Sequence, residues 1–200
     1  MQHAGARSSL IPLYRAPDIV YRSLDYYGPD IVHFCDLIDA AVLPELIALQ
    51  EGVRARFPEM DIMRSIPIAQ GGRADGTLNL SFAEALAPLS DWFLTDTLLI
   101  AKSNDAAEQP VEGFVGITGT TCDWRAAARL VTAVDVPVIL AGGLGPDNVG
   151  EGIRATRPAG VDSCTRTNAM NDDGVPVRFK KDLDRVARFV EAARQAAAEI

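Results

Sequence analysis

Short runs of apolar residues alternate along the chain with longer segments in which apolar side chains recur at helical spacing. The short runs are typical of buried strands, and the longer segments predict amphipathic helices. The predicted strands are 10–14, 30–35, 61–68, 92–96, 113–117, 136–141 and 160–163, and the predicted helices are 17–27, 43–57, 81–88, 123–133, 147–156 and 181–198. This alternation predicts an α/β protein of βαβ units around a parallel sheet.

The number of strands bears on the architecture, because a closed TIM-type (β/α) barrel has eight of them. We count six, or seven if residues 113–117 form a strand, so the pattern predicts an incomplete barrel of this type. The 200 residues are near the lower limit for that fold and predict a single domain over residues 1–200. Residues 102–112 form the longest irregular stretch and predict an exposed active-site loop.

Charge and cysteine content exclude several classes of function. The chain has 19 basic and 27 acidic residues, a net charge of −8, which disfavours a nucleic-acid partner. No stretch approaches the ~20 apolar residues of a membrane span, and the first residues do not form a signal peptide. Cys35, Cys122 and Cys164 are odd in number and widely spaced, which favours reduced thiols in a cytoplasmic protein and no metal site.

Paired glycines follow one of the predicted strands. Gly142 and Gly143 come directly after strand 136–141, and a Pro-Asp-Asn sequence at 146–148 precedes the next helix. A turn without side chains lets backbone N–H groups approach a phosphate, and the dipole of the following helix attracts the same charge. We therefore predict a phosphate site at these glycines. The alternative is a tight turn that binds nothing.

A second group of candidates follows the last predicted strand. Ser163, Cys164, Thr165 and Arg166 offer hydroxyl groups and a guanidinium there. In (β/α) barrels the loops after the last two strands form the usual phosphate site, so these residues strengthen the prediction at the glycines. The alternative is that the hydroxyl groups cap a helix or a turn.

A Gly- and Thr-rich segment, residues 116–124, opens onto another predicted helix. Gly119 within it offers backbone contacts to an anion. Cys122 and Trp124 of the same segment are better explained by packing than by reactivity.

Titratable groups lie at the ends of two predicted strands. Asp96 ends the apolar strand 92–96, where a desolvated and rigidly held carboxyl would favour its protonated form and suit a general acid. The alternative is a structural Asp that caps the next turn. His33 and Cys35 alternate along strand 30–35 and so share one face, where they could form an acid/base pair. The alternative is a core histidine and a buried thiol.

Five motifs carry a family resemblance. They are 93–97 (FLTDT), 116–124 (GITGTTCDW), 137–149 (PVILAGGLGPDNV), 157–162 (RPAGVD) and 189–193 (FVEAA). In this order they resemble the phosphoribosylanthranilate isomerases, well over residues 90–195 and loosely over residues 10–90. The resemblance implies a (β/α) barrel without a cofactor that converts a phosphorylated aminoaldose to an aminoketose by an Amadori rearrangement in tryptophan biosynthesis.

The resemblance also implies roles for single residues. In the family a strand-end Asp protonates the ribose ring oxygen to give a Schiff base, and this role falls on Asp96. Backbone groups around Gly142, Gly143, Ser163 and Cys164 would hold the phosphate of the sugar substrate. A Cys in a Lys-x-Cys-Gly motif on the family's first strand removes the C2 proton, and that motif has no counterpart here.

The chain therefore resembles the family from its third βα unit onward, and we take Cys35 as a substitute general base. The family's Ser-Gly in the last loop is Thr165-Arg166 here, so Arg166 is expected to bind phosphate through its side chain. The family's Gln-x-His-Gly motif reads HFCD at residues 33–36. An open barrel leaves two unpaired edges, which a homodimer would cover. The alternative function is a paralogue without catalysis that serves as a phosphosugar-binding or oligomerisation module.

Overall fold

The computed structural model describes residues 5–70, 76–99, 112–116 and 118–200. Within them, six strands form one sheet in which every neighbouring pair is parallel and follows the order of the chain. The strands are β1 (Ser9–Leu10), β2 (Ile31–Phe34), β3 (Asp61–Ala69), β4 (Trp92–Leu98), β5 (Val138–Leu140) and β6 (Gly160–Val161). The α/β class is confirmed, and the parallel sheet has the smaller of the two expected strand numbers.

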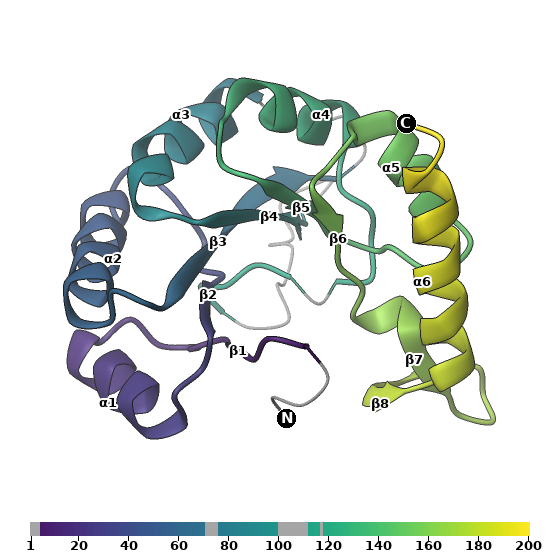
Figure 1. The fold of residues 1–200 in the computed structure, drawn as a ribbon, viewed down its shortest axis with the longest axis horizontal. Coiled ribbons are helices and arrows are strands. Elements are labelled where there is room, and N and C mark those ends of the chain that lie inside the picture. Colours follow the sequence, from purple (N-terminus) through teal and green to yellow (C-terminus); the bar gives the residue numbers. More distant parts are fainter. Residues whose placement is uncertain (1–4, 71–75, 100–111, 117) are drawn as a thin grey trace, which may run out of the picture.

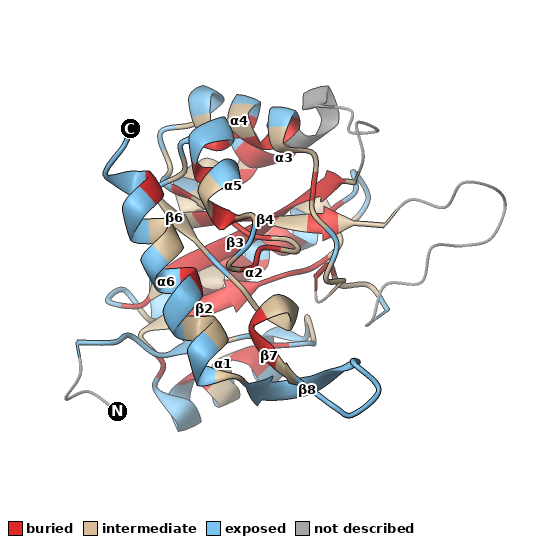
Figure 2. Cartoon of the chain, turned by 90° about the vertical axis from the view of Figure 1, so that its right-hand side faces the viewer, coloured by how far each residue is buried: buried red, intermediate tan, exposed pale blue. Residues whose placement is uncertain are grey.

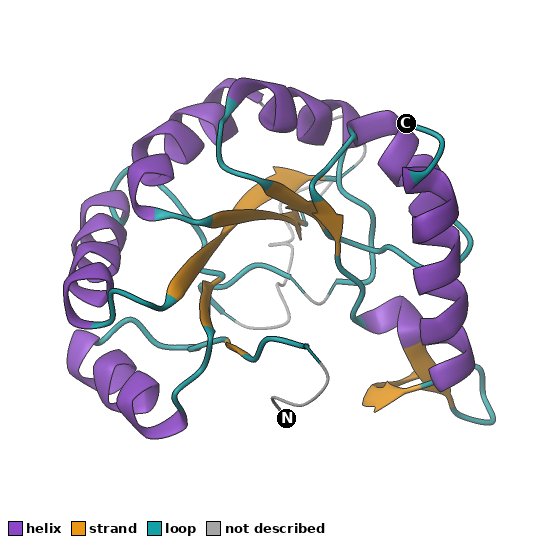
Figure 3. Cartoon of the chain, in the orientation of Figure 1, coloured by secondary structure: helices purple, strands orange, loops and turns teal. Residues whose placement is uncertain are grey.

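The described helices form an arc on the outer face of this sheet (Figure 1). They are α1 (Pro17–Tyr27), α2 (Leu43–Arg56), α3 (Gly76–Leu86), α4 (Trp124–Ala133), α5 (Val149–Thr156) and α6 (Leu183–Ala197), with short 3₁₀ helices η2 (Ala87–Leu89) and η3 (Thr165–Thr167). A parallel sheet wound in this way curves as in a TIM-type barrel. It is open between β1 and β6, so the described chain is a half-barrel (Figure 3).

The main hydrophobic core lies between the outer face of the sheet and the helices, where buried residues are concentrated (Figure 2). Ile66 and Phe93 reach it from the strands, and Leu130 reaches it from α4. Successive side chains of a strand point to opposite faces, so Met63 and Leu94 lie in a separate, smaller cluster on the inner face. That inner face is the lumen of the half-barrel, and it is where the cavity described below lies.

Local signals in the sequence explain where several helices begin and end. The Asp123 side chain accepts the backbone N–H groups of Arg125 and Ala126 and so caps α4. Asp182 caps α6 in the same way, which explains why this helix begins at Leu183 and not at residue 181. Gly28 ends α1 with a φ of 50°, a left-handed conformation that glycine adopts without strain.

Two predicted strands differ from the structure. The predicted strand 10–14 is reduced to the end of β1, because Pro12 has no N–H to donate to a sheet. The described residues of 113–117 are not a strand. Gly113 and Gly116 have φ values of 76° and 110°, which extended backbone does not allow. The predicted helix 81–88 begins earlier, at the start of α3.

A short antiparallel hairpin follows the last strand of the sheet, and the sequence did not predict it. It consists of β7 (Asn168–Met170) and β8 (Pro176–Lys181). Every residue of β8 is exposed, so this segment lacks the buried apolar run by which the other strands were recognised. The predicted active-site loop 102–112 lies outside the described residues except for Glu112.

Candidate active site

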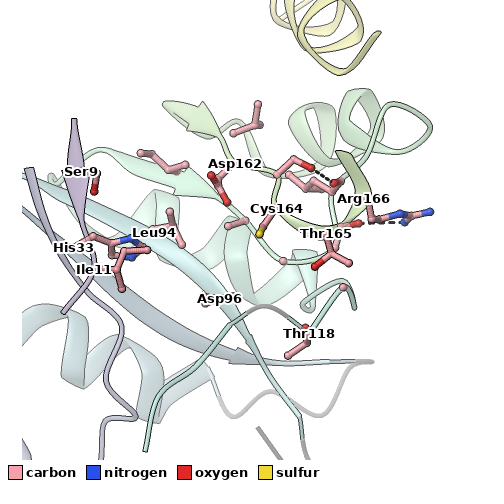
Figure 4. Close-up of a pocket in the computed structure, with 18 of the residues that line it drawn as sticks. Ser9, Ile11, His33, Leu94, Asp96, Thr118, Asp162, Cys164, Thr165 and Arg166 are labelled. Carbon is pink, nitrogen blue, oxygen red and sulfur yellow. Dashed lines mark hydrogen bonds between the residues drawn. The ribbon is translucent and has the colours of Figure 1, made fainter. Parts of the chain in front are cut away.

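A cavity of about 470 Å³ occupies the lumen at the carboxyl ends of the strands (Figure 4). All six strands contribute to its lining, through Ser9, His33, Met63, Leu94, Ile139 and Val161. This edge of the sheet is where barrel enzymes hold their reactive groups. The predicted site residues that line the cavity are Asp96, Gly119, Gly142, Gly143, Ser163, Cys164, Thr165 and Arg166.

Asp96 lies in the carboxyl half of β4 and reaches the cavity from there. Its Oδ1 accepts the backbone N–H of Thr97 at 2.9 Å, which orients the carboxyl group. Gly116 lies against the same carboxyl so closely that any side chain at Gly116 would collide with it. Burial raises the pKa of Asp96 to about 7, the Thr97 N–H opposes this shift, and the charge of Asp162 adds to it. The group can therefore donate a proton near neutral pH.

The paired glycines form a turn that only glycine can occupy. Gly142 and Gly143 have φ values of 92° and 58°. A side chain at Gly142 would collide with the Thr97 hydroxyl, and one at Gly143 would collide with the backbone of Thr120 and Thr121. The turn therefore presents bare backbone to the cavity, as a phosphate site requires.

Side chains of the loop after β6 tie it to the paired-glycine turn. The Ser163 hydroxyl donates to the Leu144 carbonyl oxygen at 2.6 Å. Arg166 donates to the Gly143 carbonyl oxygen at 3.1 Å and forms an ion pair with Asp147 at 2.9 Å. The two loops predicted to share a phosphate are thus adjacent and fixed relative to each other.

Gly119 also faces this part of the cavity. Its φ is 68°, and a Cβ at Gly119 would meet the methyl group of Thr165 at 3.4 Å. Cys122, in the same predicted segment, is buried, and burial raises the pKa of its thiol to about 12. Packing is therefore the better explanation of Cys122, as expected from the sequence.

A lysine that the sequence pattern did not single out lies beneath the loop after β6. Lys181, at the end of β8, donates to the Cys164 carbonyl oxygen at 2.6 Å and to the Thr167 hydroxyl at 3.0 Å. It lines the cavity together with Phe179 of the same strand. The sequence predicted Lys181 as the first residue of a helix, so nothing in its pattern indicated this position.

A second carboxyl, that of Asp162, was also missed. It follows β6 directly and lines the same cavity as Asp96. Desolvation raises the pKa of Asp162, and the positive charge of Lys181 and the Ser163 N–H oppose this shift. The rule that selected Asp96, a carboxyl at the end of an apolar strand, would have found Asp162 too.

Cys35 and His33 differ from the acid/base pair predicted for them. Cys35 is buried, does not line the cavity, and has a thiol pKa raised to about 12, chiefly by burial and then by the charges of Asp36 and Asp96. The thiol keeps its proton at neutral pH, which does not suit a general base. His33 lines the cavity and shares a hydrogen bond with Ser65 at 2.9 Å, and burial lowers its pKa to about 4. This is the behaviour of a neutral core histidine.

Two other kinds of site find no support in the part of the chain that the structure describes. The described residues contain no group of three or more His, Cys, Asp or Glu side chains that could bind a metal ion. None of the described helices combines the length and apolar character needed to cross a membrane.

Comparison with known proteins adds a family assignment to this geometry. Residues 92–192 match the family model of N-(5'-phosphoribosyl)anthranilate (PRA) isomerase. An N-(5'-phosphoribosyl)anthranilate isomerase of Haloferax volcanii is 35% identical over 192 residues. That match covers 93% of this chain and 77% of the relative. The chain thus spans about three quarters of the length of this relative.

Solved structures share the fold of this chain. The structure of N-(5'-phosphoribosyl)anthranilate isomerase from Pyrococcus furiosus superimposes with a TM-score of 0.64 at 17% identity, covering 97% of this chain and 76% of that one. A phosphoribosylanthranilate isomerase in complex with reduced 1-(o-carboxyphenylamino)-1-deoxyribulose 5-phosphate superimposes with a TM-score of 0.60 at 16% identity, covering 94% and 70%. The chain belongs to the N-(5'-phosphoribosyl)anthranilate isomerase family, the aldose–ketose isomerases of tryptophan biosynthesis.

Proposed function

We propose that this chain binds the phosphate group of a phosphorylated aminoaldose between the loops after β5 and β6, and that Asp96 is the general acid of its Amadori rearrangement. One observation carries the proposal. A desolvated carboxyl with a pKa near 7 lines the same cavity as the paired-glycine turn and the Ser163 loop. A phosphosugar held by these loops would have its ring within the lumen that Asp96 faces.

The phosphate site combines bare backbone with positive charge. Gly142 and Gly143 supply successive backbone groups in left-handed conformations, a geometry that suits anions. The first turn of α5 lies next to them in the chain and adds its dipole. Arg166 and Lys181 line the cavity beside these groups and would offset the charge of a dianion.

The acid step needs a proton that is present at neutral pH and can be given up. The Asp96 carboxyl would donate it to the ribose ring oxygen as the bond from that oxygen to C1 breaks and the Schiff base forms. The negative charge of Asp162 favours the protonated form of Asp96. The proposal assigns no base role to Cys35, because its thiol stays protonated at neutral pH.

The test separates acid catalysis from phosphate binding. Asp96→Asn is expected to lower kcat by about 10² to 10⁴, the usual contribution of a general acid, with little change in the affinity for ribose 5-phosphate measured by calorimetry. Gly143→Val is expected to abolish ribose 5-phosphate binding, because its side chain would collide with the Thr120 and Thr121 backbone. Asp25→Asn, an exposed carboxyl on α1, is the control. Turnover by Asp96→Asn at the rate of the unaltered chain would refute the acid role.

A second function is favoured by the open sheet, in which β1 and β6 each have a single neighbour among the described strands. If the unaltered chain binds ribose 5-phosphate but shows no turnover, it is a phosphosugar-binding or oligomerisation module. The homodimer and the cytoplasmic location expected from the sequence stay predictions.

A further inference from the structure

A short segment between β4 and α4, residues 113–116, lies against the loop after β2 (Figure 1). Two backbone hydrogen bonds join the segment to this loop. The Val115 N–H donates to the Cys35 carbonyl oxygen at 2.8 Å. The Leu37 N–H donates to the Gly113 carbonyl oxygen at 2.8 Å. Residues 113–116 are called the strap below, and their backbone is fixed to the carboxyl end of one strand.

An arginine side chain from a third element reinforces this attachment. Arg15, which lies between β1 and α1, donates through Nη2 to the Gly113 carbonyl oxygen at 3.1 Å. Through Nε it donates to the Asp36 carboxylate at 2.9 Å. Its guanidinium also lies 5.9 Å from the centre of the Phe114 ring, within range of a cation–π interaction. Arg15 therefore contacts both the strap and the loop to which the strap is joined.

The carboxylate that accepts from Arg15 is itself held in place. The Asp36 side chain is 2% exposed, and its other oxygen accepts from Arg64 at 2.7 Å. Arg64 in turn donates to the Gln50 side chain of α2 at 2.7 Å. Burial and a second partner leave the Asp36 side chain little freedom to move. Arg15 is thus anchored to a fixed point of the fold.

The other end of the strap lies on the proposed general acid. Gly116, the last residue of the strap, is buried and has a φ of 110°. Its backbone approaches the Asp96 carboxyl so closely that a Cβ at this position would collide with the carboxyl. The strap therefore covers one side of Asp96 and excludes water from it. Burial is also the largest cause of the raised pKa of Asp96.

We propose that Arg15 is a positioning residue, which clamps the strap to the end of β2 and so holds Gly116 over the Asp96 carboxyl. Arg15 is not among the described residues that line the cavity, so it acts through the strap and not on the substrate. The importance of this clamp for catalysis rests on the proposed acid role of Asp96. The shielding of Asp96 from water does not depend on that role.

The direction of a change in pKa separates two ways in which Arg15 could affect Asp96. Loss of a nearby positive charge raises the pKa of a carboxyl, whereas loss of burial lowers it. The other titratable groups that act on Asp96 among the described residues are Asp162, Cys35 and Cys122. Both thiols have a pKa of about 12 and stay uncharged at neutral pH, and Asp162 belongs to the loop after β6. A lower pKa of Asp96 after removal of Arg15 would therefore report the entry of water.

The test is a nuclear magnetic resonance titration of the Asp96 carboxyl in the full chain, with and without the substitution Arg15→Gln. The variant is expected to lower the pKa of Asp96 by at least about one pH unit, because desolvation of a buried carboxyl accounts for shifts of up to about 3 to 5 units. The Val115 N–H of the strap is expected to exchange with solvent at least about tenfold faster, because the strap opens more often.

Arg54→Gln is the matched control. Arg54 also donates to one backbone carbonyl oxygen, that of Leu89 at 3.2 Å, and to one carboxylate, that of Asp91 at 2.8 Å. The side chains of Arg15 and Arg54 are 26% and 33% exposed, so the two substitutions remove similar contacts from similar surroundings. Arg54→Gln is expected to change neither the titration of Asp96 nor the exchange of the strap.

Turnover gives a second readout. Above its pKa, the protonated fraction of a carboxyl falls about tenfold for each unit by which that pKa is lowered. The kcat of Arg15→Gln at pH 8 is therefore expected to fall about tenfold, with unchanged affinity for ribose 5-phosphate. The unchanged affinity would also show that the variant is folded. Arg15→Lys cannot donate in two fixed directions, so its Asp96 pKa is expected to lie between those of Arg15→Gln and the unaltered chain, and it replaces Arg15→Gln if the latter does not fold.

An unchanged or raised pKa of Asp96 after substitution of Arg15 would overturn the proposal, and so would an equal fall in Arg54→Gln. Normal turnover by Asp96→Asn would instead refute the acid role alone. The titration and the exchange of the strap would still test the clamp in that case, so failure of one proposal can be told from failure of the other.

Discussion

Burial decides what the titratable side chains around the cavity can do. It raises the pKa of Asp96 to about 7 and that of Cys35 to about 12, and it lowers the pKa of His33 to about 4. The cause is the same in each case, because loss of water disfavours the charged form of a group. At neutral pH, Cys35 and His33 are therefore uncharged, and both the protonated and the ionised form of Asp96 are populated.

The raised pKa of Asp96 predicts a particular pH dependence of stability. The folded state holds the proton more tightly than the unfolded state. The contribution of Asp96 to the free energy of unfolding is therefore fully present below pH 3.8, the ordinary pKa of the Asp side chain. It is lost as the pH rises to about 7. Asp96→Asn removes it. Relative to this variant, the unaltered chain is expected to lose up to about 4 kcal/mol between pH 4 and pH 8. Urea unfolding of both proteins across this range would measure the difference, and a constant difference would contradict the prediction.

A buried ion pair at the start of the loop after β2 predicts a large loss of stability. Asp36 accepts from Arg64 at 2.7 Å and from Arg15 at 2.9 Å, and the Arg64 side chain is 0% exposed. Asp36→Asn would leave the Arg64 charge buried without its counter-charge, at a cost of about 3 to 5 kcal/mol.

Asp25→Asn is the matched control for Asp36→Asn. It breaks an ion pair with Arg56 in which both side chains are more than half exposed, and such pairs contribute less than about 1 kcal/mol. Urea unfolding of the two variants would measure their losses of stability. Equal losses would show that the buried Asp36 ion pair contributes no more to stability than the exposed pair of Asp25.

At the scale of elements, helix caps differ between α4 and α1. The Asp123 side chain caps α4 through two backbone N–H groups, whereas Ala16, at the corresponding position of α1, has extended backbone and no side-chain oxygen to accept them. Asp123→Ala is expected to cost about 1 kcal/mol, and Ala16→Ser is expected to stabilise the chain by about 0.5 to 1 kcal/mol. The midpoint temperature of thermal unfolding should fall for Asp123→Ala and rise for Ala16→Ser. Shifts of the same sign would show that capping does not limit the stability of α1.

At the scale of the whole molecule, an open half-barrel predicts unequal protection of its strands. β3 and β4 pair over seven residues from Met63 to Ala69 and have neighbours on both sides. β1 and β6 pair over two residues each and have a free edge among the described strands. We expect backbone N–H groups of β1 and β6 to exchange at least about 100-fold faster than those of β3, because opening a short edge strand exposes little apolar surface. Nuclear magnetic resonance would measure this, and uniform exchange rates would contradict it.

Much of the site could be found in the sequence because its signals are local. The strand-end position of Asp96, the paired glycines at 142 and 143, and the N-cap at Asp123 each depend on a few adjacent residues. The positions that were missed or changed depend on distant contacts. Lys181 reaches the cavity only because a hairpin folds beneath the loop after β6, and Cys35 is excluded from it by burial against other elements.

The order of the six parallel strands and the six α-helices, and the turn at Gly142 and Gly143, follow from the amino-acid sequence alone, since backbone preferences and hydrophobic periodicity act over a few residues. The tertiary structure decided which carboxyl and amino groups share the lumen and which thiol is buried. These properties depend on desolvation and on contacts between segments far apart in the chain, and neither quantity is present in a local pattern.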